Sequence, residues 1–317
     1  MNTGILAAFA TLLCWTIGTF AFTLASQRAN PAAVNRVRLV FAALLLLLVV
    51  TIFYHISLVA IFTIPTLAQW FWLGLSGVIG LTLGDYFAFT AYSILGSSKT
   101  SLFSTFAPVA ALVLGIMMLN ETINLYGIIG MSISTSGIIW FVLATQKEAA
   151  QQHNKQLILK GIAFAILGAV GQGLGLVCAK KGLMLPTNTG EPISAVHATW
   201  IRMSVGAIIA YVSVLFSTNI IAEFKSITTN AYKLKPLLLG TLFGPVIGVS
   251  LSLLAATHLP VGLAQTIFSL LPITVMLAAV LAKREQVNYT ALVAAAICIL
   301  GVLVLVWRNE LQQLISL

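Results

Sequence analysis

Charged residues are scarce in this chain of 317 residues: 16 are basic and 7 acidic, which is 7% of the sequence. A soluble domain carries about 25% charged residues. Hydrophobic residues make up 60% of the chain, and the mean hydropathy is +1.05. A single soluble core stops growing near this chain length, so no water-soluble fold can hide that much apolar surface. The composition excludes a soluble enzyme, a disordered chain and a secreted disulfide scaffold. It indicates a polytopic membrane protein.

Cysteines and basic clusters are also few. Cys14, Cys178 and Cys298 all lie in apolar segments, which is typical of small hydrophobic residues. The net charge is +9, but the basic residues stand singly or in pairs at the ends of apolar runs, as topology-determining charges do. We therefore expect no nucleic-acid partner. The histidines lack metal-binding spacing and the chain has no phosphate-binding glycine loop, so we expect no metal and no cofactor, and an ATP-driven pump is excluded.

Ten apolar segments reach the length of about 20 residues that a helix needs to cross a bilayer. They do not alternate in polarity as barrel strands would, so the predicted fold is all-α. The segments are 4–25, 34–54, 69–94, 99–119, 123–144, 159–183, 194–216, 235–257, 261–282 and 287–307.

The chain contains an internal repeat. Shifting the second half back by 164 residues aligns seven Gly, Pro, Ala and charged positions, and an offset of 157 serves the first span of each half. The matched pairs are Arg38 and Arg202, Gly80 and Gly244, Gly84 and Gly248, Ala91 and Ala255, Pro108 and Pro272, Glu121 and Glu285, Gly137 and Gly301, Gly4 and Gly161, and Gly18 and Gly175. The predicted organisation is a first five-helix repeat at 1–145, a polar linker at 146–158 and a second repeat at 159–310.

An odd number of spans in each repeat has a physical consequence. The second repeat must enter the membrane from the opposite side, so the two copies are inverted relative to each other. Inverted repeats build alternating-access transporters, with the substrate site near the midplane between the halves. The sequence therefore predicts a secondary transporter with two inverted five-helix repeats.

Several motifs resemble the EamA-type ten-helix transporters of the drug/metabolite transporter superfamily. The similarity covers nearly the whole chain. It lies in Gly84-Asp85-Tyr86, Ala91-Tyr92, Gly96 to Thr100, Pro108, Glu121, Gly137, Gly171-Gln172-Gly173 and Lys180-Lys181-Gly182. The resemblance implies export of amino acids, other small metabolites or drugs, commonly driven by the proton gradient.

Asp85 is the only aspartate in the chain. It lies within about 5–6 Å of the midplane of its predicted span, at 1.5 Å rise per residue. A carboxylate at this depth normally faces a cavity or a partner. One interpretation is a site for a proton or a substrate amine, with Asp85 as the proton-coupling residue. The alternative is a structural acid that hydrogen-bonds a neighbouring helix, which Gly84 would allow to approach closely.

Five further residues are candidates for substrate binding. Trp15 and Gln172 match across the repeat and lie within the hydrocarbon, Tyr86 and Tyr92 flank the Asp85 region, and Arg202 is too deep in its span to reach the headgroups easily. An aromatic and polar lining would suit an amphipathic metabolite. Ordinary helix packing is the alternative for Trp15, and pairing with a carboxylate is the alternative for Arg202.

Other charged residues lie nearer the ends of the predicted spans. We expect Arg38 to reach the lipid phosphates by snorkelling, and Lys180 with Lys181 to anchor span six at the interface. Glu121 and Glu285 begin spans five and ten, where a carboxylate caps free N–H groups.

Pro108 and Pro272 occupy matching positions in spans four and nine. A proline there breaks the helix within the membrane and exposes backbone carbonyls that must face protein or a cavity. We expect the two prolines to act as paired hinges.

The predicted function is export of a small amino-acid-like or drug-like metabolite across the plasma membrane, or the inner membrane of a Gram-negative bacterium. The expected partners are the substrate, the lipid bilayer and protons, and the chain is compatible with a monomer or a homodimer. The alternatives are uptake or facilitated diffusion without coupling. A membrane-embedded enzyme is disfavoured, because it needs a cluster of ionisable groups at one depth and only Asp85 and Arg202 are deep.

The loops predict an orientation. Twelve basic residues flank the odd-numbered loops (1–2, 3–4, 5–6, 7–8 and 9–10), against three on the other side. Cytoplasmic loops carry the excess of Lys and Arg. Both termini are therefore expected outside the cytoplasm, whereas relatives with ten spans usually keep both inside.

We predict that a reporter fused after Leu317 and active only in the cytoplasm stays inactive. The reason is the twelve-to-three excess of basic residues on the side away from the termini. Enzyme activity of the fusion in intact cells measures the outcome, with the same reporter in the 146–158 loop as the positive control. An active C-terminal fusion would contradict the charge-based orientation.

Overall fold

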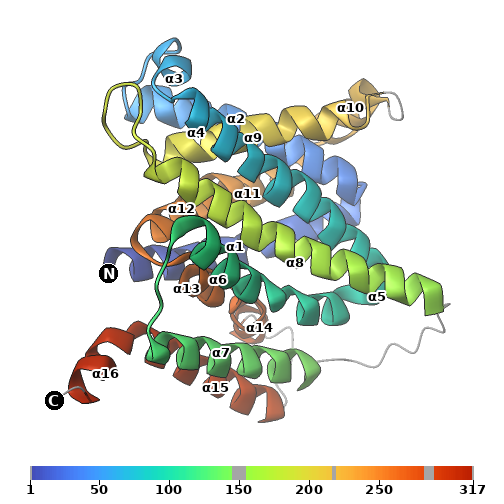
Figure 1. The fold of residues 1–317 in the computed structure, drawn as a ribbon. Helices are drawn as coiled ribbons and strands as arrows, with labels where there is room; N and C mark the ends of the chain where they lie inside the picture. Colours follow the sequence, from blue (N-terminus) through green and yellow to red (C-terminus); the bar gives the residue numbers. More distant parts are fainter. Residues whose placement is uncertain (1, 145–154, 216–218, 282–288, 316–317) are drawn as a thin grey trace.

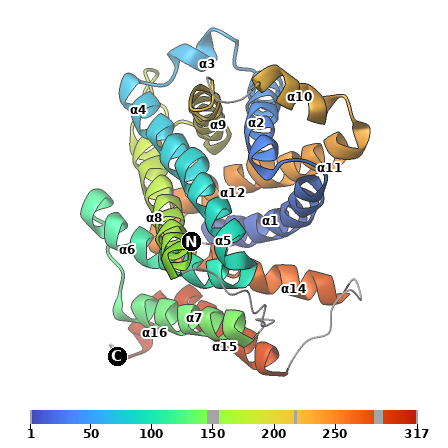
Figure 2. The ribbon, with the colours of Figure 1, turned by 90° about the vertical axis from the view of Figure 1, so that its right-hand side faces the viewer.

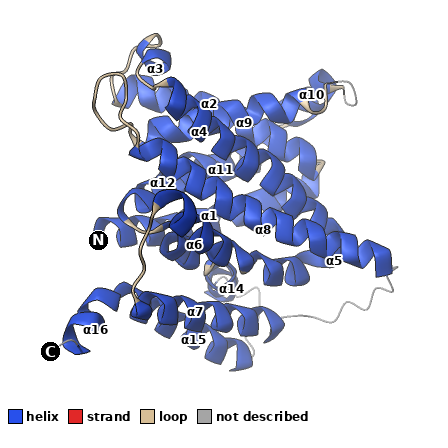
Figure 3. Ribbon diagram, in the orientation of Figure 1, coloured by secondary structure: helices blue, strands red, loops and turns tan. Residues whose placement is uncertain are grey.

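The computed structural model describes residues 2–144, 155–215, 219–281 and 289–315, which are almost entirely helical (Figures 1 and 3). The first half contains α1 (Asn2–Arg28), α2 (Pro31–Phe53), α3 (Ala60–Thr63), α4 (Leu67–Ser76), η1 (Gly77–Gly84), α5 (Asp85–Ser104), α6 (Phe106–Leu119) and α7 (Leu125–Ala144). The second half contains α8 (Lys155–Met184), α9 (Ala195–Val212), α10 (Ile220–Thr228), α11 (Ala231–Thr241), η2 (Leu242–Gly248), α12 (Val249–His258), α13 (Val261–Phe268), α14 (Leu271–Leu281), α15 (Tyr289–Val306) and α16 (Arg308–Ile315).

Nine helical stretches within the described residues are long and apolar enough to cross a membrane. The predicted fourth span is the exception, because α6 has 14 residues. At 1.5 Å per residue it is about 21 Å long, against a hydrocarbon core of about 30 Å. The fold is thus the predicted all-helical membrane protein with two repeats, with one span shorter than expected.

Several boundaries differ from the prediction: α8 begins at Lys155, inside the predicted linker at 146–158, and two further differences merge or divide predicted elements. The expected loop at 95–98 is helical, because α5 continues to Ser104 and the break falls at Thr105. The expected ninth span is interrupted at 269–270, which separates α13 from α14. Ser, Lys and Thr cost a helix only about 0.7 kcal/mol or less each, so the polar stretch after Leu95 does not by itself end α5. The short helices α3, α10 and α16 were not predicted.

Local signals start several helices. The side chain of Asn30 accepts a hydrogen bond from Ala32 N at the start of α2, where Pro31 occupies the first helical position. Thr66 and Gln69 form a reciprocal capping box at the start of α4. These residues satisfy backbone N–H groups that have no partner within the helix.

The two repeats run in opposite directions. Both chain termini and α3 lie on one side of the bundle, which we call the terminal side, whereas α10 and the start of α8 lie on the other, which we call the basic side (Figure 1). Helix α1 starts on the terminal side, and its repeat partner α8 starts on the basic side. The inversion that the odd span count requires is therefore present.

Each repeat contributes its first helix to the other repeat. Helix α1 packs against α11, η2 and α12, and α8 packs against α4, η1 and α5. Glycines make both contacts close: a Cβ on Gly175 would lie 2.9 Å from Gly80 Cα, and a Cβ on Gly18 would lie 3.3 Å from Gly244 Cα. Small residues allow such backbone contact between membrane helices. These four residues are two of the pairs that the repeat aligned.

A π-helical segment interrupts the third span of each repeat. Segment η1 ends at Gly84 and η2 ends at Gly248, which are matched positions of the repeat. Wide turns of this kind are rare and often occur at functional sites. The residue that follows is Asp85 in the first repeat and Val249 in the second, so the segments match in backbone and differ in charge.

Helices α7 and α15 form a separate pair. They lie side by side below the other helices in both views (Figures 1 and 2), and their contact is close: a Cβ on Gly130 would lie 2.8 Å from Gly301 O, and one on Gly137 would lie 2.8 Å from Cys298 N. The last span of each repeat therefore stands apart from the helices that enclose the centre of the molecule.

Candidate functional site

A cavity of about 370 Å³ lies between the two repeats. Its volume falls in the usual range for a small-molecule site, about 300–1,000 Å³. Helices α1, α2, α5 and α6 with η1 line it from the first repeat, and α8, α9, α12, α13 and α14 with η2 line it from the second. The polar lining residues are Thr19, Arg38, Asp85, Thr100, Gln172, Arg202, Ser252, Gln265 and Ser269.

The cavity extends from the centre toward the basic side. Its lining includes Phe22 and Thr100, which lie near the basic-side ends of α1 and α5. On α6, which begins just after α5 ends, the lining residue is Ala107, the second residue of the helix. On α8 the lining occupies the middle of the helix, from Ala165 to Leu176. The lining on α1 begins only at Trp15, well inside the helix.

Asp85 is held from two other helices. Arg38 of α2 forms an ion pair with Asp85 Oδ2, and Gln172 Nε2 of α8 donates to Asp85 Oδ1 at 2.9 Å. Gln172 also donates to Gly80 O in η1 at 3.1 Å, and Arg38 Nε donates to Asn35 Oδ1 at 2.6 Å. The carboxylate therefore connects both repeats at the wall of the cavity.

Arg38 was predicted to snorkel to the lipid headgroups, but in the structure it does not. Its side chain is 15% exposed and that of Asp85 16%. A buried carboxylate needs a compensating charge in its surroundings of low dielectric. Arg38 supplies this charge, and its position one turn farther into α2 than Asn35 brings it to the cavity wall.

Arg202 faces the cavity without a partner. The residue is 5% exposed, and its Nε forms no hydrogen bond with any described residue. The part of the chain that the structure describes gives Arg202 no ion pair within 4 Å, although Asp85 lies on the same cavity wall. Of the two alternatives for Arg202, pairing with a carboxylate is absent among the described residues, whereas its position at the cavity wall is observed.

Trp15 and Gln172 occupy equivalent places. Gln172 packs against η1, and Trp15 packs against η2, where a Cβ on Gly248 would lie 2.5 Å from the indole nitrogen. The Trp15 and Phe268 rings lie 5.2 Å apart at 59°. Each of these two matched residues thus packs against the π-helical segment of the other repeat, and both line the cavity.

One predicted site residue does not join this group, and the side chain of another lies outside the described part of the chain. Tyr86 is 58% exposed and is absent from the cavity wall, because it follows Asp85 by one residue and so lies about 100° around the helix. Tyr92 belongs to α5, but its side chain lies outside the described part of the chain.

The two prolines begin helices rather than interrupting them. Pro108 is the third residue of α6, and Pro272 is the second residue of α14. In the first turn a missing N–H costs no hydrogen bond, so the predicted exposure of carbonyls by the prolines themselves is wrong. Each proline does follow a helix break, and Pro272 lines the cavity.

The sequence model of the EamA-like transporter family matches residues 2–143 and 159–307. The chain belongs to the EamA-like transporter family. It is therefore a multi-pass membrane transporter of the drug/metabolite transporter superfamily, with a small-molecule substrate and the lipid bilayer as its partners. No curated protein matches the sequence.

A solved structure described as "Crystal structure of protein" has the same fold as this EamA-family chain. The two superpose with a TM-score of 0.73 over 96% of this chain and 97% of the other, at 14% sequence identity. At that identity the likeness concerns the fold alone.

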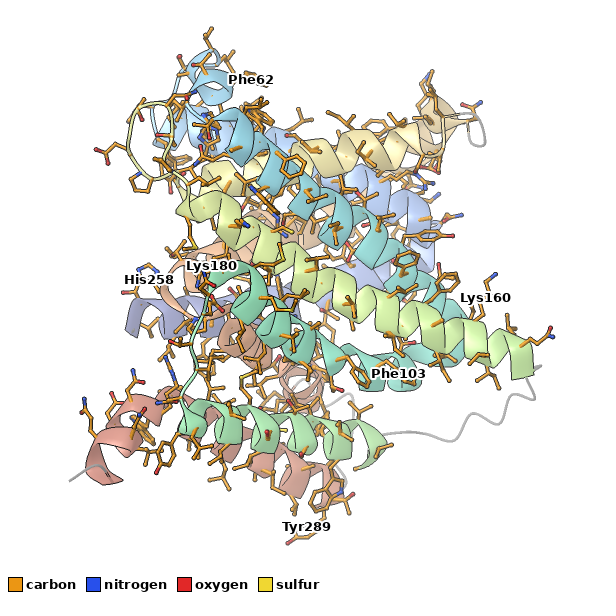
Figure 4. All side chains as sticks on the ribbon, in the orientation of Figure 1. Phe62, Phe103, Lys160, Lys180, His258 and Tyr289 are labelled. Atoms are coloured by element: carbon orange, nitrogen blue, oxygen red, sulfur yellow. The ribbon has the colours of Figure 1, made fainter. Side chains whose placement is uncertain are left out.

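In this EamA-family chain, another buried ion pair lies at the terminal side. Lys180 Nζ of α8 lies 2.7 Å from Glu121 Oε1 and 2.7 Å from Leu259 O. Glu121 Oε2 accepts a hydrogen bond from Val261 N at 2.9 Å. Figure 4 labels Lys180 at the terminal-side end of α8, near His258. We call Lys180, Glu121, Leu259 and Val261 the terminal-side lock.

The terminal-side lock corrects two predictions. Glu121 does cap a helix, but the helix is α13 of the second repeat and not α7, which begins later at Leu125. Lys180 is 12% exposed in an ion pair and not an interfacial anchor. Neighbouring Lys181 instead lies 4.4 Å from the Trp72 ring. Glu285, the repeat partner of Glu121, lies outside the described residues.

We predict that Lys180→Met lowers the free energy of unfolding by about 3–5 kcal/mol, because it leaves the buried Glu121 carboxylate without its cation. The double variant Lys180→Met with Glu121→Gln should recover most of this loss. Thermal unfolding of the purified protein in detergent measures both. Lys181→Met is the matched control and should cost about 1 kcal/mol or less. Equal losses for Lys180→Met and Lys181→Met would show that the lock adds no stability.

Proposed function

We propose that this chain is a secondary transporter that exports a small amino-acid-like or drug-like metabolite by proton-coupled alternating access. The observation that carries the proposal is the central cavity, which both inverted repeats enclose and in which Asp85 joins α2 of one repeat to α8 of the other. We assign the plasma membrane, or the inner membrane of a Gram-negative bacterium, as its location. One chain encloses the cavity, so a monomer is sufficient for transport.

The direction follows from the cavity and the charges together. The lining reaches toward the basic side, and the terminal-side lock holds the other side. Since excess Lys and Arg mark the cytoplasmic side, the cavity in this conformation would take substrate from the cytoplasm. Release on the other side requires the terminal-side lock to open and the basic-side ends of the helices to close.

Asp85 is the proposed proton-coupling residue. As a carboxylate it holds Arg38 and Gln172 and so ties α2, α5 and α8 together. Protonation removes the negative charge and the attraction to Arg38. Losing one partner of a buried pair is worth about 3–5 kcal/mol, which is enough to change a conformational equilibrium by a factor of about 10² to 5 × 10³. Proton binding at Asp85 can therefore drive the exchange between the two open states.

Uptake or facilitated diffusion without proton coupling is the alternative, and both would use the same cavity. Asp85 supports the coupled mechanism, because a carboxylate at the cavity wall can exchange a proton with the cavity. We propose no enzymatic activity: of the ionisable side chains described at the cavity, Arg38 and Asp85 neutralise each other and Arg202 is a cation that stays protonated.

We predict that Asp85→Asn abolishes uphill transport, because the amide cannot exchange a proton. The substrate would be identified first, by comparing metabolites released from overexpressing and deletion strains. Its accumulation in proteoliposomes with an imposed pH gradient then measures coupling. Arg38→Gln with Asp85→Asn, which leaves no unpaired charge, covers the case in which the single variant is unstable.

The matched control is Glu223→Gln, which removes an acid from another ion pair. Glu223 pairs with Arg36 at 2.8 Å and does not line the cavity, so this variant should keep gradient-driven accumulation. Full accumulation by Asp85→Asn would make Asp85 structural and would place the coupling group elsewhere. A parent protein that equilibrates the substrate without accumulating it would instead favour the uncoupled permease.

We also propose that Pro108 and Pro272 stiffen the helix starts after two breaks that bend during transport. Pro108→Ala and Pro272→Ala should each slow substrate flux several-fold, with stability changed by about 1 kcal/mol or less. Initial rates in proteoliposomes, divided by the amount of folded protein, measure the effect. Pro31→Ala, at the first position of α2, is the control. Parental rates in both hinge variants would make the prolines packing residues only.

A further inference from the structure

Arg202 is a cation whose position is fixed by its helix but which forms no ion pair with any described residue. Helix α9 contacts η1 closely at Arg202 and one turn after it: a Cβ on Gly77 would collide with Arg202 O, and Thr82 Oγ1 donates to Gly206 O at 2.9 Å. These backbone contacts set where the side chain begins. Gly80 leaves room beside the guanidinium, since a Cβ there would lie 3.7 Å from Arg202 Nη2.

An unpaired buried cation is expensive. Burying a charge without a partner costs several kcal/mol, and Arg202 is 95% buried with an orphaned Nε. The nearby carboxylate cannot compensate it fully, because Asp85 already holds Arg38 and Gln172. The protein therefore keeps this cation at the cavity wall at a cost to its own stability, which is expected of a residue that binds a ligand.

The charges at the cavity point to the sign of that ligand. The ionisable side chains that the structure describes on its wall are Arg38, Asp85 and Arg202. After Arg38 and Asp85 cancel, one positive charge remains. A guanidinium matches the geometry of a carboxylate, which it can bind through two parallel hydrogen bonds.

Aromatic residues of the same cavity point to the rest of the ligand. Trp15 and Phe268 form an aromatic pair at 5.2 Å, and both line the cavity. Their rings offer apolar surface to an aromatic or aliphatic body, and Gln265 and Ser252 offer hydrogen bonds.

We propose that the cavity selects small organic monoanions that carry one carboxylate on an apolar body, with the carboxylate held by Arg202 and the body against Trp15 and Phe268. This inference rests on the proposed transport function for its biological meaning, but the binding step can be measured without transport. A net charge of −1 on the ligand balances the cavity, whereas a cation would meet Arg202 unfavourably.

The test uses the purified full-length protein in detergent and three probes of similar shape: 3-phenylpropionate, its neutral amide 3-phenylpropionamide, and the cation 2-phenylethylamine. Binding is measured by calorimetry and by the shift in unfolding temperature. We expect the carboxylate to bind at least tenfold more tightly than the amide or the amine. Arg202→Gln should remove this preference, and Arg202→Lys should keep part of it, because the charge remains but the paired geometry is lost.

Lys181→Met is the control, because this lysine is cationic but does not line the cavity, and it should keep the preference. The proposal is overturned if the amide binds the parent protein as tightly as the carboxylate, if none of the probes binds at millimolar concentration, or if Arg202→Gln lowers stability while the preference persists. Selective binding of the carboxylate without its transport in proteoliposomes would overturn the proposed function and leave the anion site standing.

Discussion

The cost of a charge inside the hydrocarbon governs the arrangement of this transporter. Asp85 is tolerated because Arg38 reaches it from α2 and Gln172 from α8, so one carboxylate draws together helices from both repeats. The same constraint explains the terminal-side lock, in which Glu121 uses one oxygen for Lys180 and the other for a helix N-terminus. Arg202 is the exception among the described residues of the cavity wall, because this buried cation has no partner. Its position is therefore where we propose that the ligand binds.

Much of the architecture could be predicted from the sequence. The lengths of the apolar segments predicted the spans, and the matched Gly, Pro and charged positions predicted the repeat. The glycines match because close backbone contacts require small residues at the same places in both copies. Gly18, Gly80, Gly175 and Gly244 are such positions, and in the structure they meet in two equivalent contacts. Trp15, Gln172 and Asp85 were predicted at the site for another reason: they are unusual residues at mid-span.

What the sequence did not predict depends on contacts between distant segments. Arg38 has the spacing of a snorkelling residue within its own helix, and only the approach of α5 turns it into the partner of Asp85. A search for the cation that neutralises the only aspartate could have found it. Glu121 was expected to cap the helix that follows it, but α7 begins four residues later, where Asn124 accepts from Gly127 N. Glu121 accepts from Val261 N of α13 instead. The π-helical turns and the continuation of α5 to Ser104 depend on packing, for which no local residue pattern is specific.

The π-helical segment before Asp85 makes the length of the chain itself part of the site. A π-helical turn, with its i→i+5 hydrogen bonds, holds one more residue than an α-helical turn. One residue removed from 77–84 would therefore let the segment close into an α-helix with Asp85 still directed toward Arg38. A single-codon deletion in this segment, at a position other than Leu81, would remove the wide turn while keeping the charge of Asp85 and every residue of the cavity wall.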